Sequence, residues 1–479
     1  MSQFPEKTFK LAFLGMAVAI PLLLNPFGFF PFEADKIFLF RIIVSIMLFV
    51  WLLRIGSFQN LKTKLLNFFE EVRWLDLRFL FLLLTAVYGL SIIFSIAPAE
   101  SFFGSPHRQF GFITILFFFL FFWLFNNSVN EKLFANFLKI NLFTAFIIGS
   151  YAILQHFGID FWPAGYVETI KGTHIIRSIS TIGNPNYLGA FIAMTLPFTY
   201  LSIIIARGKQ KILPIVIFLI QITSLYFTYN RGGWLAACGG LVCLVILQLV
   251  RQNRPTDKNF RFKTIAQLTF IIAIFGIFFF APPDQGGRLR QTDIGVGNDG
   301  GSMFIRLQDY KFALEKIPEK ILFGYGPETY QYLAETRIIS EEESKIDNRL
   351  SDRVHNFFLD NLISIGFCGL LIIILIFISV FRSSAKLLLN NETDIRKKQM
   401  IIAANSSLIA YLIAMQLHFD TITTSFILFF NFALIHSIAK EHKKTAFIPE
   451  KTSKPMFIFA TAILLICLAF NLSQIFYNL

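Results

Sequence analysis

Residues 356–381 read NFFLDNLISIGFCGLLIIILIFISVF, a stretch in which Asp360 is the only charged side chain. An α-helix rises about 1.5 Å per residue, so about 20 apolar residues cross the hydrocarbon core of a bilayer. Comparable stretches recur along all 479 residues, which are 55% hydrophobic and 15% charged, whereas soluble domains are about 25% charged. This composition excludes a soluble enzyme, a disordered chain and a secreted disulfide scaffold. These stretches are apolar throughout and do not alternate polar with apolar residues, as the strands of a membrane β-barrel do. We therefore predict an all-α integral membrane protein, a polytopic helical bundle.

Thirteen segments are candidates for membrane spans. The first contains two prolines, Pro21 and Pro26, which disfavour a continuous helix, so we expect a bundle of 12–13 transmembrane helices. The thirteen segments are 11–30, 37–55, 75–97, 110–125, 132–156, 186–206, 211–229, 232–250, 263–281, 356–381, 399–418, 421–440 and 455–477.

The distribution of Lys and Arg predicts the orientation of the chain. Counted from a cytoplasmic N-terminus, the inner connections carry 26 Lys and Arg residues and the short outer connections carry five. Cytoplasmic connections are enriched in Lys and Arg, so we predict a multi-pass protein with a cytoplasmic N-terminus. The net charge of +13 is then mostly an orientation signal, and nucleic-acid binding is not supported. No cleavage site follows the first apolar run, which we interpret as an uncleaved span.

The predicted spans divide the chain into three parts. Residues 1–281 are expected to form transmembrane helices 1–9, and residues 355–479 transmembrane helices 10–13. Between them, residues 282–354 form an extracytoplasmic loop that is rich in Gly and Asp over 284–302. Residues 303–314 then place apolar side chains at helical spacing, which predicts an amphipathic helix at the outer membrane interface.

Two polar segments precede spans on the predicted outer face. In the first, Asn184 or Asn186 can cap the following helix, whose free N–H groups could bind an anion; a simple capped turn explains the same residues. In the second, Arg231 lies between two apolar spans, where an unpaired Arg is costly. It either binds a ligand or extends to the membrane interface.

Two further segments lie on or beside the long loop. Arg306, on the amphipathic helix, has Asp309 one turn further on, a spacing that often has only a structural role. His355 lies at the outer mouth of a span among polar residues that could fix its tautomer. Arg108 precedes another outer helix start and either extends a basic mouth or anchors the span. His418, in a tight outer turn, is interpreted as structural.

The sequence contains no recognisable metal or nucleotide motif. The four cysteines lie in apolar runs without a CxxC spacing and are interpreted as small buried apolar residues. These are Cys238, Cys243, Cys368 and Cys467.

The order and outer placement of these segments resemble the O-antigen ligase and O-antigen polymerase superfamily, over about residues 90–440. The motifs are Arg108-x-x-Gly111, Gly183-Asn-Pro-Asn-x-Leu-Gly189, Asn230-Arg-Gly-Gly-x-Leu-Ala236, Arg306 before Leu322-Phe-Gly-Tyr-Gly-Pro327, and His355-Asn-x-x-Leu359 before Gly366.

This resemblance implies a GT-C-like glycosyltransferase of the bacterial inner membrane, acting in lipopolysaccharide or polysaccharide biosynthesis. Such an enzyme moves a glycan from undecaprenyl pyrophosphate to lipid A core, another glycan or a protein on the outer face. It is expected to be inverting, independent of metal ions and free of cofactors. The family's functional residues correspond here to His355 as the catalytic residue and to Arg231 and Arg306 as pyrophosphate ligands. Further substrate-binding candidates are Arg108, Asn184 and Asn186.

Other readings remain open from the sequence. Some members of the superfamily have been proposed to transport inorganic carbon, although acidic residues are absent from the span centres, which disfavours ion coupling. A flippase for lipid-linked sugars would need a cationic cavity deep between helices, whereas the arginines of this sequence are predicted at the outer edge. The ligases are usually described with twelve spans and both ends inside, whereas thirteen spans place the C-terminus outside.

Overall fold

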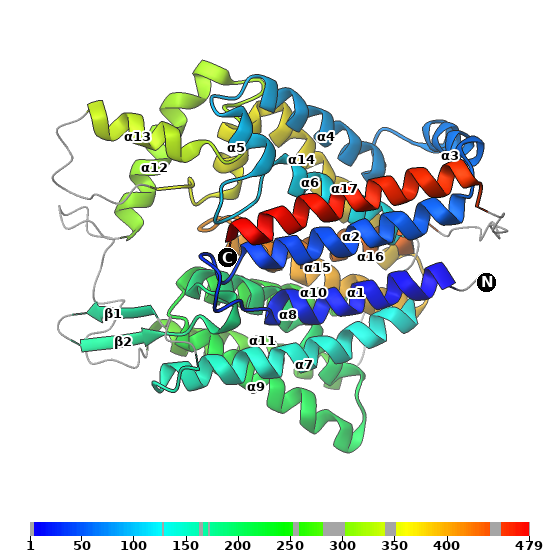
Figure 1. Cartoon of the computed structure of the whole chain (residues 1–479). Coiled ribbons are helices and arrows are strands. Elements are labelled where there is room, and N and C mark those ends of the chain that lie inside the picture. The colour runs from blue at the N-terminus through cyan, green and yellow to red at the C-terminus, as the bar shows by residue number, and fades with distance from the viewer. Residues whose placement is uncertain are drawn as a thin grey trace.

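The computed structural model describes residues 4–126, 129–161, 166–170, 173–251, 258–280, 302–340, 351–440 and 452–478. These residues form an all-α bundle with one small β-hairpin, which confirms the predicted polytopic helical class (Figure 1). The helices are α1 Phe4–Leu22, α2 Ala34–Ile55, α3 Phe58–Glu71, α4 Leu77–Ile93, α5 Pro98–Phe103, α6 Phe112–Phe125, α7 Glu131–His156, α8 Pro185–Ile205, α9 Ile212–Phe227, α10 Arg231–Arg251, α11 Lys258–Phe280, α12 Ser302–Lys316, α13 Tyr330–Ser340, α14 Phe357–Leu389, α15 Ile395–Ala414, α16 Ile422–Ala439 and α17 Lys454–Asn478. The strands β1 Tyr166–Ile170 and β2 Thr173–Arg177 pair antiparallel, with Tyr166 opposite Arg177.

Each of the thirteen predicted segments coincides with a helix. Among the described residues, eight helices are long and apolar enough to cross a membrane, namely α2, α7, α8, α9, α10, α14, α16 and α17. Three shorter apolar helices lie in α4, α6 and α11. The other two segments correspond to α1 and α15, whose first turns carry charged residues.

The first helix departs from its predicted bounds of 11–30. It begins at Phe4 and ends at Leu22, directly after Pro21. The chain then turns, with the Asn25 N–H donating to the Pro31 carbonyl at 3.1 Å and the Asn25 side chain donating to Asp35 at 2.5 Å. Proline has no N–H to continue a helix, so the apolar residues beyond Pro26 form a turn at the helix end.

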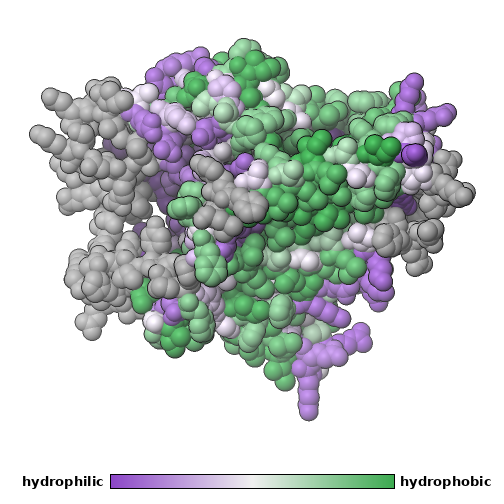
Figure 2. Space-filling model, in the orientation of Figure 1, coloured by the Kyte–Doolittle hydropathy of each residue, from purple (hydrophilic) through white to green (hydrophobic). Residues whose placement is uncertain are grey.

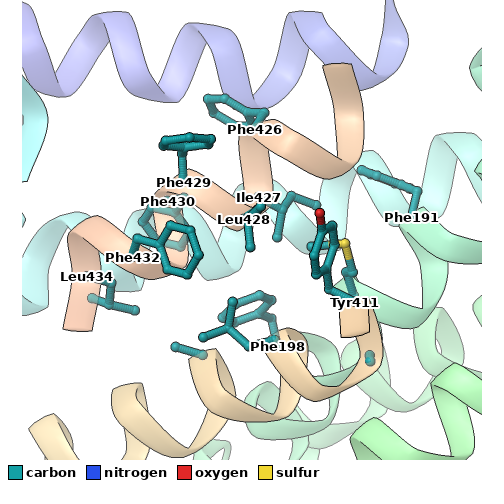
Figure 3. Close-up of a cluster of buried hydrophobic side chains, with 14 of the residues drawn as sticks. Phe191, Phe198, Tyr411, Phe426, Ile427, Leu428, Phe429, Phe430, Phe432 and Leu434 are labelled. Atoms are coloured by element: carbon teal, nitrogen blue, oxygen red, sulfur yellow. The ribbon is translucent and has the colours of Figure 1, made fainter. Parts of the chain in front are cut away.

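The centre of the bundle is built mostly from phenylalanine. Helix α16 runs through it and is buried from Ile422 to His436. Its Phe426, Phe429 and Phe430 face the neighbouring helices (Figure 3). The Phe430 ring lies 4.3 Å from that of Phe137 on α7, centroid to centroid. Lipid tails are as apolar as these rings, so close packing of the rings stabilises the bundle more than removal from water does.

Small residues let α8, α10 and α15 approach one another closely. A Cβ on Gly240 of α10 would lie 2.9 Å from the Ala410 Cβ of α15, and one on Gly233 would lie 3.0 Å from the Gly189 Cα of α8. Such contacts are typical of helix pairs in membranes. They fix the start of α10 against the start of α8.

Helix α14 is broken near its start. Gly366 has φ +67° and ψ −174°, which divides the helix into a short first part and a long second part. The backbone groups freed there bond to the segment after α12: Tyr325 N–H donates to the Ile363 carbonyl at 2.8 Å, and Phe367 N–H to the Ile321 carbonyl at 2.7 Å. The loop and the helix break are therefore one structural unit.

The two ends of the molecule differ. The N-terminus and α3 lie at one end, and α12, α13 and the β-hairpin lie at the other, near the end of α17 (Figure 1). The surface between them is hydrophobic over α2 and α17, with hydrophilic residues toward both ends (Figure 2). We call the end that carries α12 and α13 the loop end. The predicted Gly/Asp-rich stretch 284–302 lies outside the described residues except for Ser302.

The predicted amphipathic helix is present as α12. Its Ala313 is buried in a small second core with Tyr325, Tyr330 and Ile363, while Leu307 and Leu314 are exposed. Part of its apolar face thus packs on protein, and its position at a membrane interface stays a prediction.

Candidate functional site

Four helices begin at the loop end beside one another. Asn184 caps α8 by accepting from the Asn186 N–H at 2.8 Å, and Asn356 caps α14 by accepting from two backbone N–H groups at 3.1 Å. Thr421 caps α16, and Asn230 immediately precedes α10. Helix N-termini carry partial positive charge, so this convergence favours a bound anion.

Asn230 joins three of these helix starts. The side chain of Asn230 is buried and donates to the Asn186 carbonyl at 3.2 Å. Its Oδ1 lies 3.3 Å from His418 Nε2. Arg231 follows as the first residue of α10. A Cβ on Gly232 would lie 3.2 Å from His418 Nε2, so the start of α10 directly contacts the turn between α15 and α16.

His355 is held in a strained, oriented conformation. Its φ is +59°, which is uncommon for a residue with a Cβ. Its Nδ1 lies 2.9 Å from the Arg353 carbonyl, and its ring meets the Phe419 ring edge-on at 5.2 Å. A carbonyl only accepts, so Nδ1 carries the proton and Nε2 holds a free lone pair in the neutral ring.

The charges around His355 favour this neutral form. Burial, and then the positive charge of Arg306, lower the pKa of His355 below its ordinary value of 6.5. Asp352 acts in the opposite direction and Arg108 adds to the lowering. Because the lowering effects exceed that of Asp352, the imidazole is positioned as a proton acceptor at neutral pH.

Arg306 lies on α12, one turn before Tyr310, which hydrogen-bonds this helix to the segment that contains His355. Tyr310 Oη donates to the carbonyls of His355 and Gln416, each at 3.2 Å. Burial lowers the pKa of the Arg306 guanidinium, opposed by Tyr310 and by Asp309. The Asp309 carboxylate also accepts from Ser351 Oγ at 2.6 Å, so it links α12 to the segment before His355.

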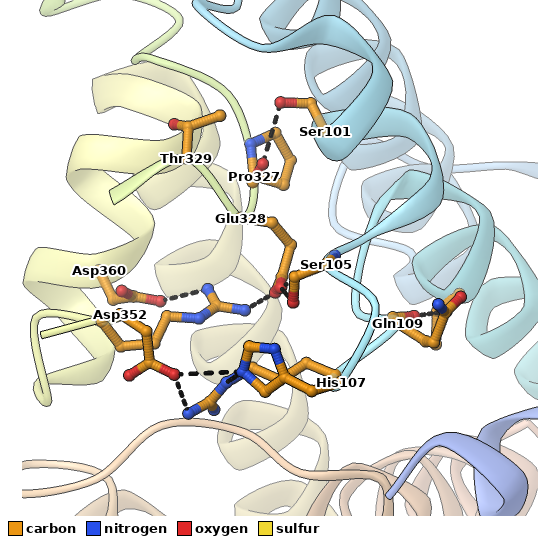
Figure 4. A network of polar contacts seen from close by, with 12 residues as sticks. Ser101, Ser105, His107, Gln109, Pro327, Glu328, Thr329, Asp352 and Asp360 are labelled. Atoms are coloured by element: carbon orange, nitrogen blue, oxygen red, sulfur yellow. Dashed lines mark hydrogen bonds and ion pairs between the residues drawn. The ribbon is translucent and has the colours of Figure 1, made fainter. Parts of the chain in front are cut away.

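Arg108 is fixed beside the same histidine. Its guanidinium pairs with Asp352 and lies 3.9 Å above the centre of the Phe419 ring. Its Nε lies 3.1 Å from the Nε2 of His107, which in turn faces Asp352 (Figure 4). Arg108 and His107 together hold the pKa of the Asp352 carboxyl well below its usual range, although burial opposes them.

A second ion cluster braces the segment that carries His355. The Arg353 guanidinium pairs with Asp360 at 2.9 Å and with Glu328, whose carboxylate also accepts from Ser105 Oγ at 2.7 Å (Figure 4). These residues come from the α5–α6 connection, the segment before α13 and the start of α14. The contacts of Glu328 and of Arg353, which is close to His355 in the chain, join the three segments.

The structure thus brings most of the predicted residues to one place. Arg306 and Arg108 lie within electrostatic reach of His355. Arg231 precedes Gly232, whose added Cβ would contact His418. The Asn184 side chain serves as a helix cap, and Asn186 contributes its backbone carbonyl.

Three residues at the centre of this arrangement were not singled out as functional from the sequence. Asn230 and Phe419 link the separate segments, and His418 lies at their junction, where burial and the charge of Arg306 lower its pKa well below the ordinary value. His418 lies in a short turn between spans, and only the packing of α8, α10 and α15 shows what surrounds it.

The fold and this site define a multi-pass membrane protein with a basic, histidine-containing site where several helices begin. Residues 216–374 match the family model for O-antigen ligase, which confirms the resemblance to that superfamily over about a third of the chain. The matched segment contains Arg231, Arg306 and His355, whereas Arg108, Asn184 and Asn186 precede it. The match supports an O-antigen ligase-like function at the membrane. No curated protein matches the chain significantly.

Proposed function

We propose that this chain is an inverting glycosyltransferase of the bacterial inner membrane that takes its glycan from undecaprenyl pyrophosphate. The acceptor is a lipid A core, a glycan or a protein on the outer face. The observation that carries the proposal is His355, with a fixed Nδ1 proton and a lowered pKa, beside Arg306 and the start of α10.

In the proposed reaction, an acceptor hydroxyl attacks the anomeric carbon of the donor sugar. His355 Nε2 takes the hydroxyl proton, the new glycosidic bond forms, and the bond to the pyrophosphate oxygen breaks. The bonding electron pair leaves with the polyprenyl pyrophosphate. Attack from the face opposite the leaving group inverts the anomeric centre.

Arg231 and Arg306 would bind the departing pyrophosphate. A guanidinium presents two parallel N–H donors that match two phosphate oxygens. Developing negative charge on the leaving oxygen is stabilised by such preorganised donors and by the helix N-termini around them. No metal is needed for this step if both arginines engage.

The test is transfer by the purified full chain in lipid nanodiscs, with polyprenyl pyrophosphate-linked glycan as donor. General-base catalysis typically contributes about 10²–10⁴-fold, so His355→Gln and His355→Ala should each reduce transfer by at least about 100-fold while donor still binds. His436→Gln, which changes a histidine in the last turn of α16, at the end of that helix away from Thr421, should retain wild-type transfer. Wild-type transfer by His355→Gln would contradict the assignment of the base, and Asp352 and Asp360 would be tested next.

A further inference from the structure

A cavity of about 280 Å³ has Arg108 in its wall. The Arg108 guanidinium lies over the Phe419 ring, which also meets the ring of His355. The cavity opens between the α1–α2 turn, the α5–α6 connection and the starts of α8 and α16. We name it the Glu33 cavity. Its walls include Phe29, Glu33, Arg108, Tyr187 and Asp420.

Two groups in this cavity indicate the chemistry of its ligand. The Glu33 Oε2 accepts from the Ile422 N–H at 3.3 Å, whereas the buried Oε1 has no hydrogen-bond partner among the described residues. A buried acceptor without a donor costs free energy, which a ligand hydroxyl would recover. Burial raises the pKa of Glu33, and it raises that of Asp420 to about 6.

The starts of α8 and α16 contribute partial positive charge to this cavity, but the two carboxyls in its wall oppose an anionic ligand. Arg108, the guanidinium in the wall, is already paired with Asp352, so a phosphate would gain little there and would meet Glu33 and Asp420. A ligand with hydroxyl groups can donate to both carboxyls. Phe29 and Tyr187 add aromatic faces, on which the C–H groups of a sugar ring can pack.

We propose that the Glu33 cavity binds a neutral sugar ring of the acceptor glycan at the edge of the catalytic site. This inference rests on the proposed function and names the acceptor side of the same site. Arg108 lines the cavity and its charge acts on His355, so a glycan bound in the cavity lies next to the catalytic site.

The exposed turn between α1 and α2 offers a matched pair of variants. Phe29 is 76% exposed and lines the cavity, whereas Phe27 is 84% exposed and does not. Neither side chain packs in the core, so replacing either with alanine should leave the fold intact. Glu33→Gln keeps the oxygen that accepts from Ile422 while it removes the charge.

The experiment measures binding to the full chain in nanodiscs by saturation-transfer NMR. The probe is the oligosaccharide mixture released by mild acid from the surface glycan of the producing bacterium. Wild type and Phe27→Ala should bind the probe equally. Phe29→Ala and Glu33→Gln should bind it about tenfold more weakly, the loss expected for one charge-assisted hydrogen bond or its equivalent.

His355→Gln separates this inference from the proposed function. It should bind the oligosaccharide like wild type but not transfer glycan. Absence of binding to wild type, or equal binding by Phe29→Ala and Phe27→Ala, would overturn the acceptor cavity and leave the catalytic proposal standing. Inorganic pyrophosphate binding that depends on Glu33 would also overturn it. Oligosaccharide binding with full transfer by His355→Gln would instead overturn the catalytic role.

Discussion

The two proposed pyrophosphate ligands contribute shape as well as charge. A lysine at either position keeps the positive charge but loses the planar fork that binds two phosphate oxygens at once. Arg231→Lys and Arg306→Lys should therefore each reduce transfer at least about tenfold, or ~1.4 kcal/mol of barrier, with normal protein levels. The matched control is Arg207→Lys, in an exposed connection at the opposite end of the bundle. Full activity in both variants would place the pyrophosphate elsewhere.

The pH dependence of transfer should follow the lowered pKa of His355. A base acts only when neutral, so kcat/KM should rise with pH with a midpoint below 6.5, the ordinary histidine value. Arg306→Gln removes a positive neighbour that favours the neutral ring, so the midpoint should move to higher pH. Arg306→Lys retains the charge and should keep the wild-type midpoint despite its lower rate. A midpoint unchanged in Arg306→Gln would show that this charge does not act on His355.

At the level of elements, the break in α14 requires glycine at two positions, Gly324 and Gly366. Gly324 has φ +69°, and a Cβ there would lie 2.5 Å from the Ser364 backbone; a Cβ on Gly366 would lie 2.3 Å from the Leu322 backbone. The short first part of α14 begins two residues after His355. The position of the histidine thus depends on this backbone contact.

Alanine at Gly366 should separate the loop from the helix. The positive φ and the backbone clash predict a loss of about 2 kcal/mol or more of stability and a larger loss of transfer. Gly89→Ala, on the adjacent helix α4 with nothing within 4 Å of its added Cβ, should be neutral or slightly stabilising. Thermal unfolding of the two purified variants measures the difference. Equal midpoints would mean that the loop adapts and that the contact is not needed.

The sequence predicted the elements better than their ends. Thirteen helices could be located because an apolar run of span length has few other structures available in a bilayer. The end of α1 was misplaced since the residues after Pro26 remain apolar although the backbone turns. The short hairpin and α3 carry no span-length signal and were not predicted.

The site was predictable where a residue is unusual in its own surroundings. Arg231 and His355 stand out as polar groups at span ends. The contact of Asn230 with His418, by contrast, depends on the close approach of α8, α10 and α15 at their glycines. Local sequence does not contain that information.

For the whole molecule, the proposed chemistry requires one orientation in the membrane. Helices α12 and α13 lie at the loop end, and the N-terminus lies at the opposite end (Figure 1). Tyr310 of α12 donates to the His355 carbonyl, so His355 belongs to the loop end. Lys and Arg are concentrated in the connections predicted to share the N-terminal side, so the membrane potential and the insertion machinery should retain that side in the cytoplasm. An acceptor and a flipped donor would then reach the site from outside.

Reporter fusions test this orientation directly. A reporter inserted within 282–354 should be active outside, and reporters within 251–263 and 382–398 should be active inside. A fusion after Leu479 should also report outside, because thirteen crossings place the two ends on opposite faces. A C-terminal reporter in the cytoplasm would mean that one of the helices does not cross, with α1 the first to examine because charged residues occupy its first turns. A cytoplasmic signal from 282–354 would be decisive in a different way, since His355 would then face the compartment that lacks the acceptor.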